Sequence, residues 1–409
     1  MILLSHPTGN ENVRQAARAF SDEGILAEFW TTLSWNPNTP LRHVLPQSLR
    51  ELLQRRSFPD SVRARTHTVP FREMMRLLGG AIGFSSRHET GALSIDAVSR
   101  ELDRKVAERL GEIEPPQAVK LIYAYEDAAL ESFRVAAQRG IARIYDLPIG
   151  YWRVGQRIFA EEREREPEWA STLTGARDSA EKLARKDEEL QHAQRVIVAS
   201  TFTKETLAEA PCPAKIDIVP YGAPPPISRE IRRSSGPLKV LFVGSLGQRK
   251  GLSYLIKAIE MMKDSVDLTL LGRKAASDCR PLESALRKYS WLPSLPHAGV
   301  LREMQNHDVL VFPSLFEGFG LVILEAMAQG TPVITTAHTC GPDIIEDGSD
   351  GFIVPIRAAE AIADKLELLA RDRDRLGATK QAAQRKAESC RWEIYRRRLV
   401  EVAREVMAS

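Results

Sequence analysis

Short apolar runs alternate with helical patterns along most of the chain, and this alternation constrains the fold more than any other feature. In the second half the runs are LKVLFVG (238–244), VDLTLLG (266–272), DVLVFPS (308–314), TPVITT (331–336) and GFIVP (351–355). In the first half they are MILLS at the start, VKLIYAY (119–125), IARIYDLP (141–148) and RVIVAS (195–200). Apolar strands separated by helices indicate βα units and parallel sheets.

The length of the chain and one linker-like stretch predict two domains. A chain of 409 residues exceeds what one hydrophobic core usually serves. Residues 220–237, PYGAPPPISREIRRSSGP, are rich in proline, glycine and serine, as expected of a domain boundary. We therefore expect Rossmann-like domains over residues 1–220 and 221–388. Residues 389–409 are typical of an amphipathic C-terminal helix, for which packing back toward the N-terminal domain is one arrangement.

Composition and charge exclude several classes of protein. A net charge of +3 and a pI near 8.6 argue against a dedicated nucleic-acid binder, which would carry a strong basic stripe. The four cysteines have no metal-ligand spacing, so we expect reduced, structural cysteines in a cytoplasmic protein. The N-terminus does not resemble a signal peptide, and no apolar run reaches the roughly 18 residues of a membrane span.

Arginines are concentrated in the less regular stretch that follows the first predicted βα unit. A solvated charged face explains this stretch as well as a surface for anionic lipid or a phosphate-bearing substrate does. The second interpretation would place the protein at the inner face of a membrane. The arginines are Arg42, Arg50, Arg55, Arg56, Arg63, Arg65, Arg72 and Arg76, against Glu51, Asp60 and Glu73.

The run LFEGFGLVILEAMA (315–328) carries two glutamates in otherwise apolar and glycine-rich surroundings. The pattern predicts a helix that starts near Leu321, whose unpaired N–H groups would favour a phosphate or a similar anion. A ribose diol would satisfy Glu325 inside that helix, and Glu317 in the loop would meet hydroxyls further along the ligand. The alternative is that Glu325 pairs with a neighbouring Arg or Lys and that Glu317 is an ordinary loop acid.

A second motif is LFVGSLGQRKG (241–251), a strand and a glycine-containing loop that end in two cations before an apolar helix. Arg249 and Lys250 would neutralise a diphosphate there, and a solvated basic turn is the alternative. The glycines match neither a dinucleotide-binding fingerprint nor a P-loop.

These segments resemble family 4 glycosyltransferases, which are retaining enzymes of the GT-B fold. EGFGLVILE is similar to the family's E-x7-E motif, and VGSLGQRKG is similar to its G-R-L-x-x-x-K-G loop with Lys250 in place. CGPDIIEDGSDGFIVP, VIVASTFTKETL and VPYGA also fit the family's pattern. The resemblance covers residues 195–360 closely and residues 1–30 and 118–150 loosely.

The resemblance implies an α/β protein of the GT-B fold, with two Rossmann-like domains that face each other across a cleft. It also implies a retaining glycosyltransferase that moves a sugar from a nucleotide-diphosphate-sugar donor to a hydroxyl on a glycan, a lipid-linked acceptor or a small molecule. Glu317 would contact the donor sugar, and Lys250 would stabilise the departing diphosphate. Arg249 is our candidate for the family's usual arginine, whose place is taken here by Ser245.

The remaining site residues implied by the resemblance fall into two groups. On the donor side they are Gly9, Ser245, Gly272, Arg273, Gly318, Phe319, Gly320, Leu321 and Glu325. The family's usual histidine near IARIYDLPIGYW is missing, so the acceptor-side candidates are His6, Asn10 and Asp146. Cations and backbone amides would serve the diphosphate, so we expect neither a metal nor another cofactor.

Two other functions remain open on the same fold. A nucleotide-sugar epimerase or hydrolase would act on the donor without an acceptor. A catalytically idle partner subunit is compatible with Ser245 and with the missing histidine.

Overall fold

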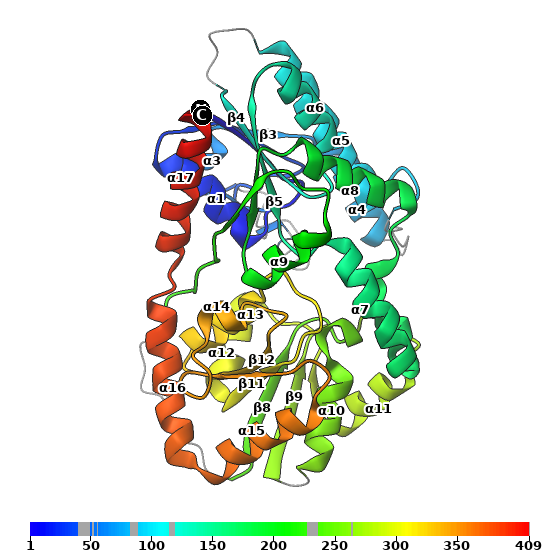
Figure 1. Cartoon of the computed structure of the whole chain (residues 1–409), viewed down its shortest axis with the longest axis vertical. Coiled ribbons are helices and arrows are strands. Elements are labelled where there is room, and N and C mark those ends of the chain that lie inside the picture. The colour runs from blue at the N-terminus through cyan, green and yellow to red at the C-terminus, as the bar shows by residue number, and fades with distance from the viewer. Residues whose placement is uncertain are drawn as a thin grey trace.

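The computed structural model describes residues 1–39, 50, 53–54, 56–81, 89–113, 119–226, 236–262 and 265–408. The chain forms two α/β halves, one above the other in Figure 1, with helices α16 (Arg373–Glu388) and α17 (Trp392–Ala408) running along one side of both. Arg42 and Arg55 of the arginine-rich stretch, and residues 227–235 of the predicted linker, lie outside the described residues.

Within the described residues, seven parallel strands form the N-terminal sheet in the order β3–β2–β1–β4–β5–β6–β7. The central strands β1 and β4 are completely buried, which explains why their sequences are apolar without alternation. The strands are β1 (Ile2–Ser5), β2 (Leu26–Thr31), β3 (Thr66–Thr68), β4 (Leu121–Tyr125), β5 (Ala142–Leu147), β6 (Arg195–Val198) and β7 (Lys215–Ile218).

The helices of this half connect successive strands. They are α1 (Glu11–Asp22), α3 (Asp60–Arg63), α4 (Phe71–Ala81), α5 (Ile95–Glu112), α6 (Leu130–Gln138), α7 (Trp152–Arg165), α8 (Ala180–His192) and α9 (Thr201–Thr206), with 3-10 helices η2 (Pro167–Thr172), η3 (Thr174–Ala176) and η4 (Leu207–Glu209).

The C-terminal half has the same architecture, a parallel sheet with connecting helices. Among the described residues, its six strands are all parallel, in the order β10–β9–β8–β11–β12–β13. They are β8 (Leu238–Val243), β9 (Val266–Leu271), β10 (Ser290–Leu292), β11 (Val309–Phe312), β12 (Val333–Thr336) and β13 (Phe352–Val354). The helices are α10 (Leu252–Met261), α11 (Arg280–Lys288), α12 (His297–Asn306), α13 (Leu321–Ala328), α14 (Gly341–Ile344) and α15 (Ala359–Arg371), with the 3-10 helix η5 (Gln248–Lys250) after β8.

The predicted fold of two Rossmann-like halves is confirmed, and each apolar run of the sequence becomes a strand. The sequence did not predict β2, β3, β7 and β10. Three of these, β3, β7 and β10, are short strands at the edges of their sheets with partly exposed side chains. Such edge strands lack the apolar runs that reveal central strands.

Two segments cross between the halves. Helix α7 and η2 belong to the first half by sequence, but Ile158, Phe159 and Trp169 pack in one core with Leu246 and Leu252 of the second half. In the opposite direction, α17 lies against α1 (Figure 1). Arg404 of α17 contacts Glu23, the residue that follows α1, at 2.6 Å. No helix in the described part of the chain is both long enough and apolar enough to cross a membrane.

Candidate functional site

Two predicted cations and one predicted carboxylate meet at the ends of neighbouring strands. Arg249 and Lys250 form η5 after β8, and Glu317 lies in the loop after β11. Glu317 Oε2 accepts a hydrogen bond from Arg249 Nη1 at 3.2 Å and forms a close ion pair with Lys250 Nζ. Because β8 and β11 are adjacent and parallel, their carboxyl ends bring these loops to the same place.

The cluster carries an excess of positive charge away from bulk water. The side chain of Lys250 is 10% exposed, and its Nζ lies 4.8 Å from the centre of the Phe312 ring. Burial, and then the charge of Arg249, lowers the pKa of Lys250 well below its ordinary value, and burial lowers the pKa of Arg249 to about 10. The Glu317 carboxylate opposes the effect on Lys250. Two cations that share one carboxylate would be stabilised by a further anion.

The loop that carries Glu317 ends at the N-terminus of α13. Gly320 caps this helix with φ 89°, a conformation that favours glycine. No side chain caps the helix and no acid lies in its first turn, so its first N–H groups and its dipole favour an anion. The expected anion site at Leu321 is therefore compatible with the observed geometry.

Gly318 has a different reason to be glycine from the one the sequence suggested. A Cβ atom at Gly318 would lie 1.8 Å from the carbonyl oxygen of Pro148 in the N-terminal half. The Gly318 carbonyl also accepts hydrogen bonds from Ser200 Oγ at 2.5 Å and Thr203 Oγ1 at 2.8 Å. The contact between the halves therefore explains Gly318, whatever a ligand requires.

Among the residues that the structure describes, the partner of Glu325 is a histidine and not an Arg or Lys. Its carboxylate, 18% exposed, hydrogen-bonds to His297 Nε2 of α12 at 2.9 Å. This hydrogen bond raises the pKa of His297, and the charges of Glu11 and Arg14 on α1 also act on this histidine. Glu325 therefore faces the start of α1, which follows the predicted Gly9–Asn10 loop.

Three further donor-side candidates, Ser245, Gly272 and Arg273, lie at the ends of β8 and β9. Leu246 N–H donates to the Arg273 carbonyl at 2.8 Å, and a Cβ at Gly272 would lie 1.7 Å from the Gly244 carbonyl oxygen. Ser245 and Arg273 are exposed on these adjoining loops. Phe319 packs against Tyr221, with ring centres 5.1 Å apart.

Two of the acceptor-side candidates, His6 and Asp146, are enclosed by the protein, and the third, Asn10, is exposed. His6 is buried, its Nδ1 accepts a hydrogen bond from Thr8 N–H at 2.9 Å, and burial lowers its pKa to about 4. Asp146 is 2% exposed and accepts a hydrogen bond from Tyr123 Oη at 2.5 Å, and burial raises its pKa to about 7. Asn10 is exposed and precedes α1 without capping it through its side chain.

Sequence reasoning missed the contacts that reach the site from distant segments. His297 on Glu325, and Ser200 and Thr203 on the Gly318 carbonyl, are the main examples. Ser200 precedes α9 in VIVASTFTKETL, a segment that the sequence identified as family-like without assigning it a role.

Comparisons with known proteins relate the C-terminal half to glycosyltransferases. The profile of the family described as Glycosyl transferases group 1 matches residues 225–386. A phosphatidyl-myo-inositol mannosyltransferase of Mycobacterium leprae is 31% identical over 179 residues, which are 42% of this chain and 47% of that protein. The putative colanic acid biosynthesis glycosyltransferase WcaL of Escherichia coli is 28% identical over 176 residues, which are 39% of this chain and 43% of that protein. The matched segments thus span less than half of these relatives.

Solved structures match over the full length. Sucrose-phosphate synthase of Thermosynechococcus elongatus gives a TM-score of 0.66 at 19% identity, and covers 100% of this chain and 99% of its own. Anabaena HepE in complex with UDP gives a TM-score of 0.64 at 16% identity, and covers 99% of both chains. At these identities the likeness shows the fold, which is GT-B. The C-terminal half, which contains Arg249, Lys250, Glu317 and Glu325, is similar to the group 1 glycosyltransferases over residues 225–386.

Proposed function

We propose that this protein is a retaining glycosyltransferase that transfers a sugar from a nucleotide-diphosphate-sugar to an acceptor hydroxyl. The observation that carries the proposal is the convergence of Arg249, Lys250 and Glu317 beside the uncapped N-terminus of α13. Buried cations and helix N–H groups together are suited to a diphosphate. The complexes of Anabaena HepE with UDP and with UDP-glucose support this class of donor.

In the proposed mechanism, the diphosphate lies between the two cations and the start of α13. The bond from the anomeric carbon to the phosphate oxygen breaks, and Lys250 and Arg249 stabilise the charge that develops on the leaving group. The acceptor oxygen bonds to the same face of the sugar, and its proton passes to the leaving phosphate. With the cations engaged by phosphate, Glu317 is free to accept hydrogen bonds from sugar hydroxyls.

Glu325 is proposed to bind the donor's ribose. Its carboxylate has two oxygens and several lone pairs, so the hydrogen bond to His297 leaves acceptor capacity for a diol. His297 would fix the orientation of this carboxylate. The Gly9 loop lies before α1, whose Glu11 and Arg14 act on His297 from the opposite half.

The acceptor class is also proposed from the relatives. One acts on phosphatidyl-myo-inositol and one belongs to colanic acid biosynthesis by name, which favours a glycan or a lipid-linked acceptor. The cations and amides at the diphosphate make a metal unnecessary in this proposal. An epimerase, a hydrolase or an idle partner subunit would lack acceptor-stimulated release of nucleoside diphosphate, and this distinguishes each of them from a transferase.

The proposal is tested by thermal stabilisation with a panel of nucleoside diphosphates and their sugars, followed by turnover. A ligand that binds only the folded protein raises its melting temperature. Glu325→Gln is expected to reduce the shift, and Lys250→Ala is expected to keep the fold but slow turnover by about 100-fold or more. Lys288→Ala, at an exposed lysine of α11, is the matched control. Wild-type shifts and rates in both site variants would refute the assignment.

Contact with an anionic membrane is a further proposal, and the exposed side chains of α4 support it better than the arginines do. Arg56 and Arg76 both pair with Glu73, and Arg72 pairs with Glu101 at 3.2 Å, so these charges are partly neutralised within the protein. On α4, four large apolar side chains are exposed: Phe71, Met74, Met75 and Leu78. Their spacing is typical of a helix that lies on a lipid surface. Sedimentation with neutral and anionic vesicles tests the contact, and loss of vesicle binding in Phe71→Ser would support it.

A further inference from the structure

A cavity of about 180 Å³ lies between the two halves beside the cation cluster. Its N-terminal walls include Glu126 after β4, Trp152 at the start of α7 and Lys186 on α8. Arg249 and Phe316 line it from the C-terminal half. The cavity is smaller than the roughly 300–1,000 Å³ of sites that enclose a whole drug-sized ligand. It therefore suits one polar end of a larger molecule.

Arg249 connects this cavity with the proposed reaction centre. Its Nη1 donates to the Phe316 carbonyl at 2.9 Å and to Glu317 Oε2 at 3.2 Å. The same side chain lines the cavity. The Arg249 guanidinium would thus lie between a ligand in the cavity and the proposed diphosphate.

The topology of the N-terminal sheet also points to Glu126. Strands β1 and β4 are neighbours, and the order of the strands reverses between them. In open α/β sheets, ligands bind at the carboxyl ends of the strands at such a switch point. Glu126 directly follows β4 at that point.

Glu126 is a largely enclosed carboxylate in the wall of the cavity. Its side chain is 10% exposed, and burial raises its pKa above the ordinary value. It lies 3.5 Å from Lys186 Nζ, whereas Asp178 lies 3.1 Å from the same ammonium group. Lys186 is thus shared between Glu126 and two aspartates, Asp127 and Asp178. A carboxylate offers about four lone-pair positions, so hydroxyl donors can still be bound.

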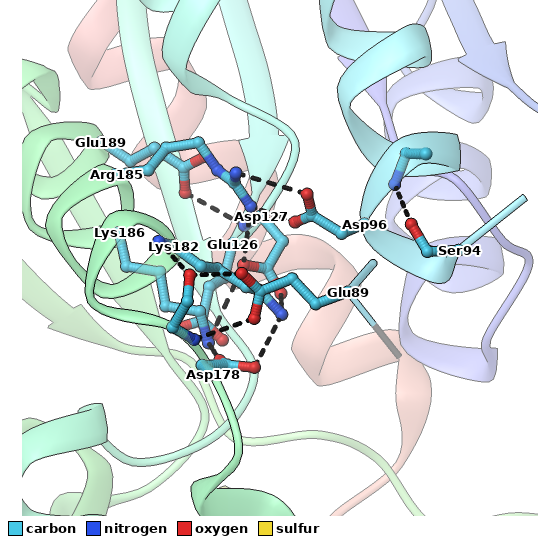
Figure 2. A network of polar contacts seen from close by, with 12 residues as sticks. Glu89, Ser94, Asp96, Glu126, Asp127, Asp178, Lys182, Arg185, Lys186 and Glu189 are labelled. Atoms are coloured by element: carbon cyan, nitrogen blue, oxygen red, sulfur yellow. Dashed lines mark hydrogen bonds and ion pairs between the residues drawn. The ribbon is translucent and has the colours of Figure 1, made fainter. Parts of the chain in front are cut away.

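A charged network around α8 holds the backbone next to Glu126 and includes Lys186, the partner of the Glu126 carboxylate (Figure 2). Lys182 pairs with Asp178 at 3.0 Å and with Asp127 at 3.4 Å. Asp127, next to Glu126, has φ 72°, and its N–H donates to Glu189 Oε2 at 3.0 Å. A positive φ is uncommon for a residue other than glycine and persists where surrounding contacts hold the backbone. Such residues cluster at functional sites.

We infer that Glu126 binds a hydroxyl of the acceptor and that the cavity beside Arg249 receives the acceptor's sugar end. This inference rests on the proposed function and names the acceptor subsite within it. In this inference Glu126 contacts the acceptor, and the enclosed Asp146 and His6 do not. Lys186 acts as a positioning residue for the Glu126 carboxylate.

The experiment compares wild type with Glu126→Gln, Glu126→Asp and Glu164→Gln, the last being an exposed glutamate of α7 that serves as control. The donor probes are UDP-glucose, UDP-N-acetylglucosamine and GDP-mannose, and the acceptor probes are simple methyl glycosides. Nucleoside diphosphate release is measured with donor alone and with each acceptor probe. Melting curves identify any variant that fails to fold.

Glu126→Gln is expected to keep the donor KM and the donor-only release of wild type, but to raise the KM for the acceptor probe about tenfold or more. The loss of a hydrogen bond to a charged group accounts for a change of this size. Glu126→Asp should recover part of the loss. An unchanged acceptor KM, or an equal rise in donor and acceptor KM, would overturn the inference while leaving the transferase intact. Absence of donor-dependent release in wild type would instead overturn the proposed function, and the subsite with it.

Discussion

The buried Asp146 makes a quantitative prediction about the pH dependence of stability. Its carboxyl is 2% exposed and contacts Tyr123 Oη, and burial raises its pKa from 3.8 to about 7. The folded state therefore binds this proton more tightly than the unfolded state. Stability is full below the unfolded pKa of 3.8 and is lost as the pH rises toward the folded pKa of about 7.

The magnitude follows from about 1.4 kcal/mol per pKa unit. Above pH 7, where Asp146 is ionised in both states, the shift costs the folded state about 4 kcal/mol. At pH 5 the folded carboxyl keeps its proton while the unfolded one ionises, and the cost is about 1.5 kcal/mol. Asp146→Asn keeps the shape and an acceptor oxygen for Tyr123 but removes the ionisation. The variant should therefore gain about 3 kcal/mol relative to wild type between pH 5 and pH 8.

The assay is urea unfolding followed by intrinsic fluorescence at both pH values, with wild type and variant in parallel so that all other titrating groups cancel. Asp22→Asn, an exposed aspartate of α1, is the control and should show no such gain. The reasoning would be refuted if the free energies of unfolding of wild type and Asp146→Asn differed by the same amount at pH 5 and at pH 8. Turnover measured on the same samples tests the rival role, because an acceptor-side base would lose its activity in Asp146→Asn.

Three further predictions follow from contacts at the site. Gly318→Ala would place a methyl group only 1.8 Å from the Pro148 carbonyl oxygen, so the two halves must move apart. We expect a lower melting temperature in calorimetry and a higher donor KM in kinetic assays. His297→Ala removes a histidine whose pKa is raised by Glu325, and whose stabilising contribution is full below pH 6.5 and lost as the pH rises through the raised pKa. The difference in melting temperature from wild type should accordingly shrink between pH 6 and pH 9, and a constant difference would contradict this. In the proposed mechanism the cations of the protein serve the diphosphate, so full activity should persist in EDTA. Recovery of lost activity on adding Mg²⁺ would contradict the metal-free proposal.

The central strands and the loop motifs could be predicted because their information is local. A strand such as LIYAY is buried on both sides and must be apolar, and Glu317 and Glu325 lie within one nine-residue run. β3 and β7 left no such trace, since their side chains are partly exposed. Their place in the sheet depends on pairing with distant strands.

The partners of the site residues could not be predicted, because they come from remote parts of the chain. His297 reaches Glu325 from α12, and Ser200 reaches the loop after β11 across the boundary between the halves. The enclosure of Asp146 likewise depends on Tyr123 of the neighbouring strand, so its burial is a property of the sheet and not of the run IARIYDLP. The same holds for Glu126, whose cavity is formed by both halves.

The exchange of segments between the halves limits how this protein can be recombined with its relatives. The matched segment 225–386 contains neither α7, which packs into the C-terminal core, nor α17, which packs on α1. The buried Glu162 of α7 accepts hydrogen bonds from Gln248, Tyr254 and Arg357 of the C-terminal half. A chimaera that replaced only the matched segment would leave this carboxylate facing foreign side chains. Grafts that carry residues 152–173 with the C-terminal half, and that leave α17 with its original α1, keep both of these interfaces intact.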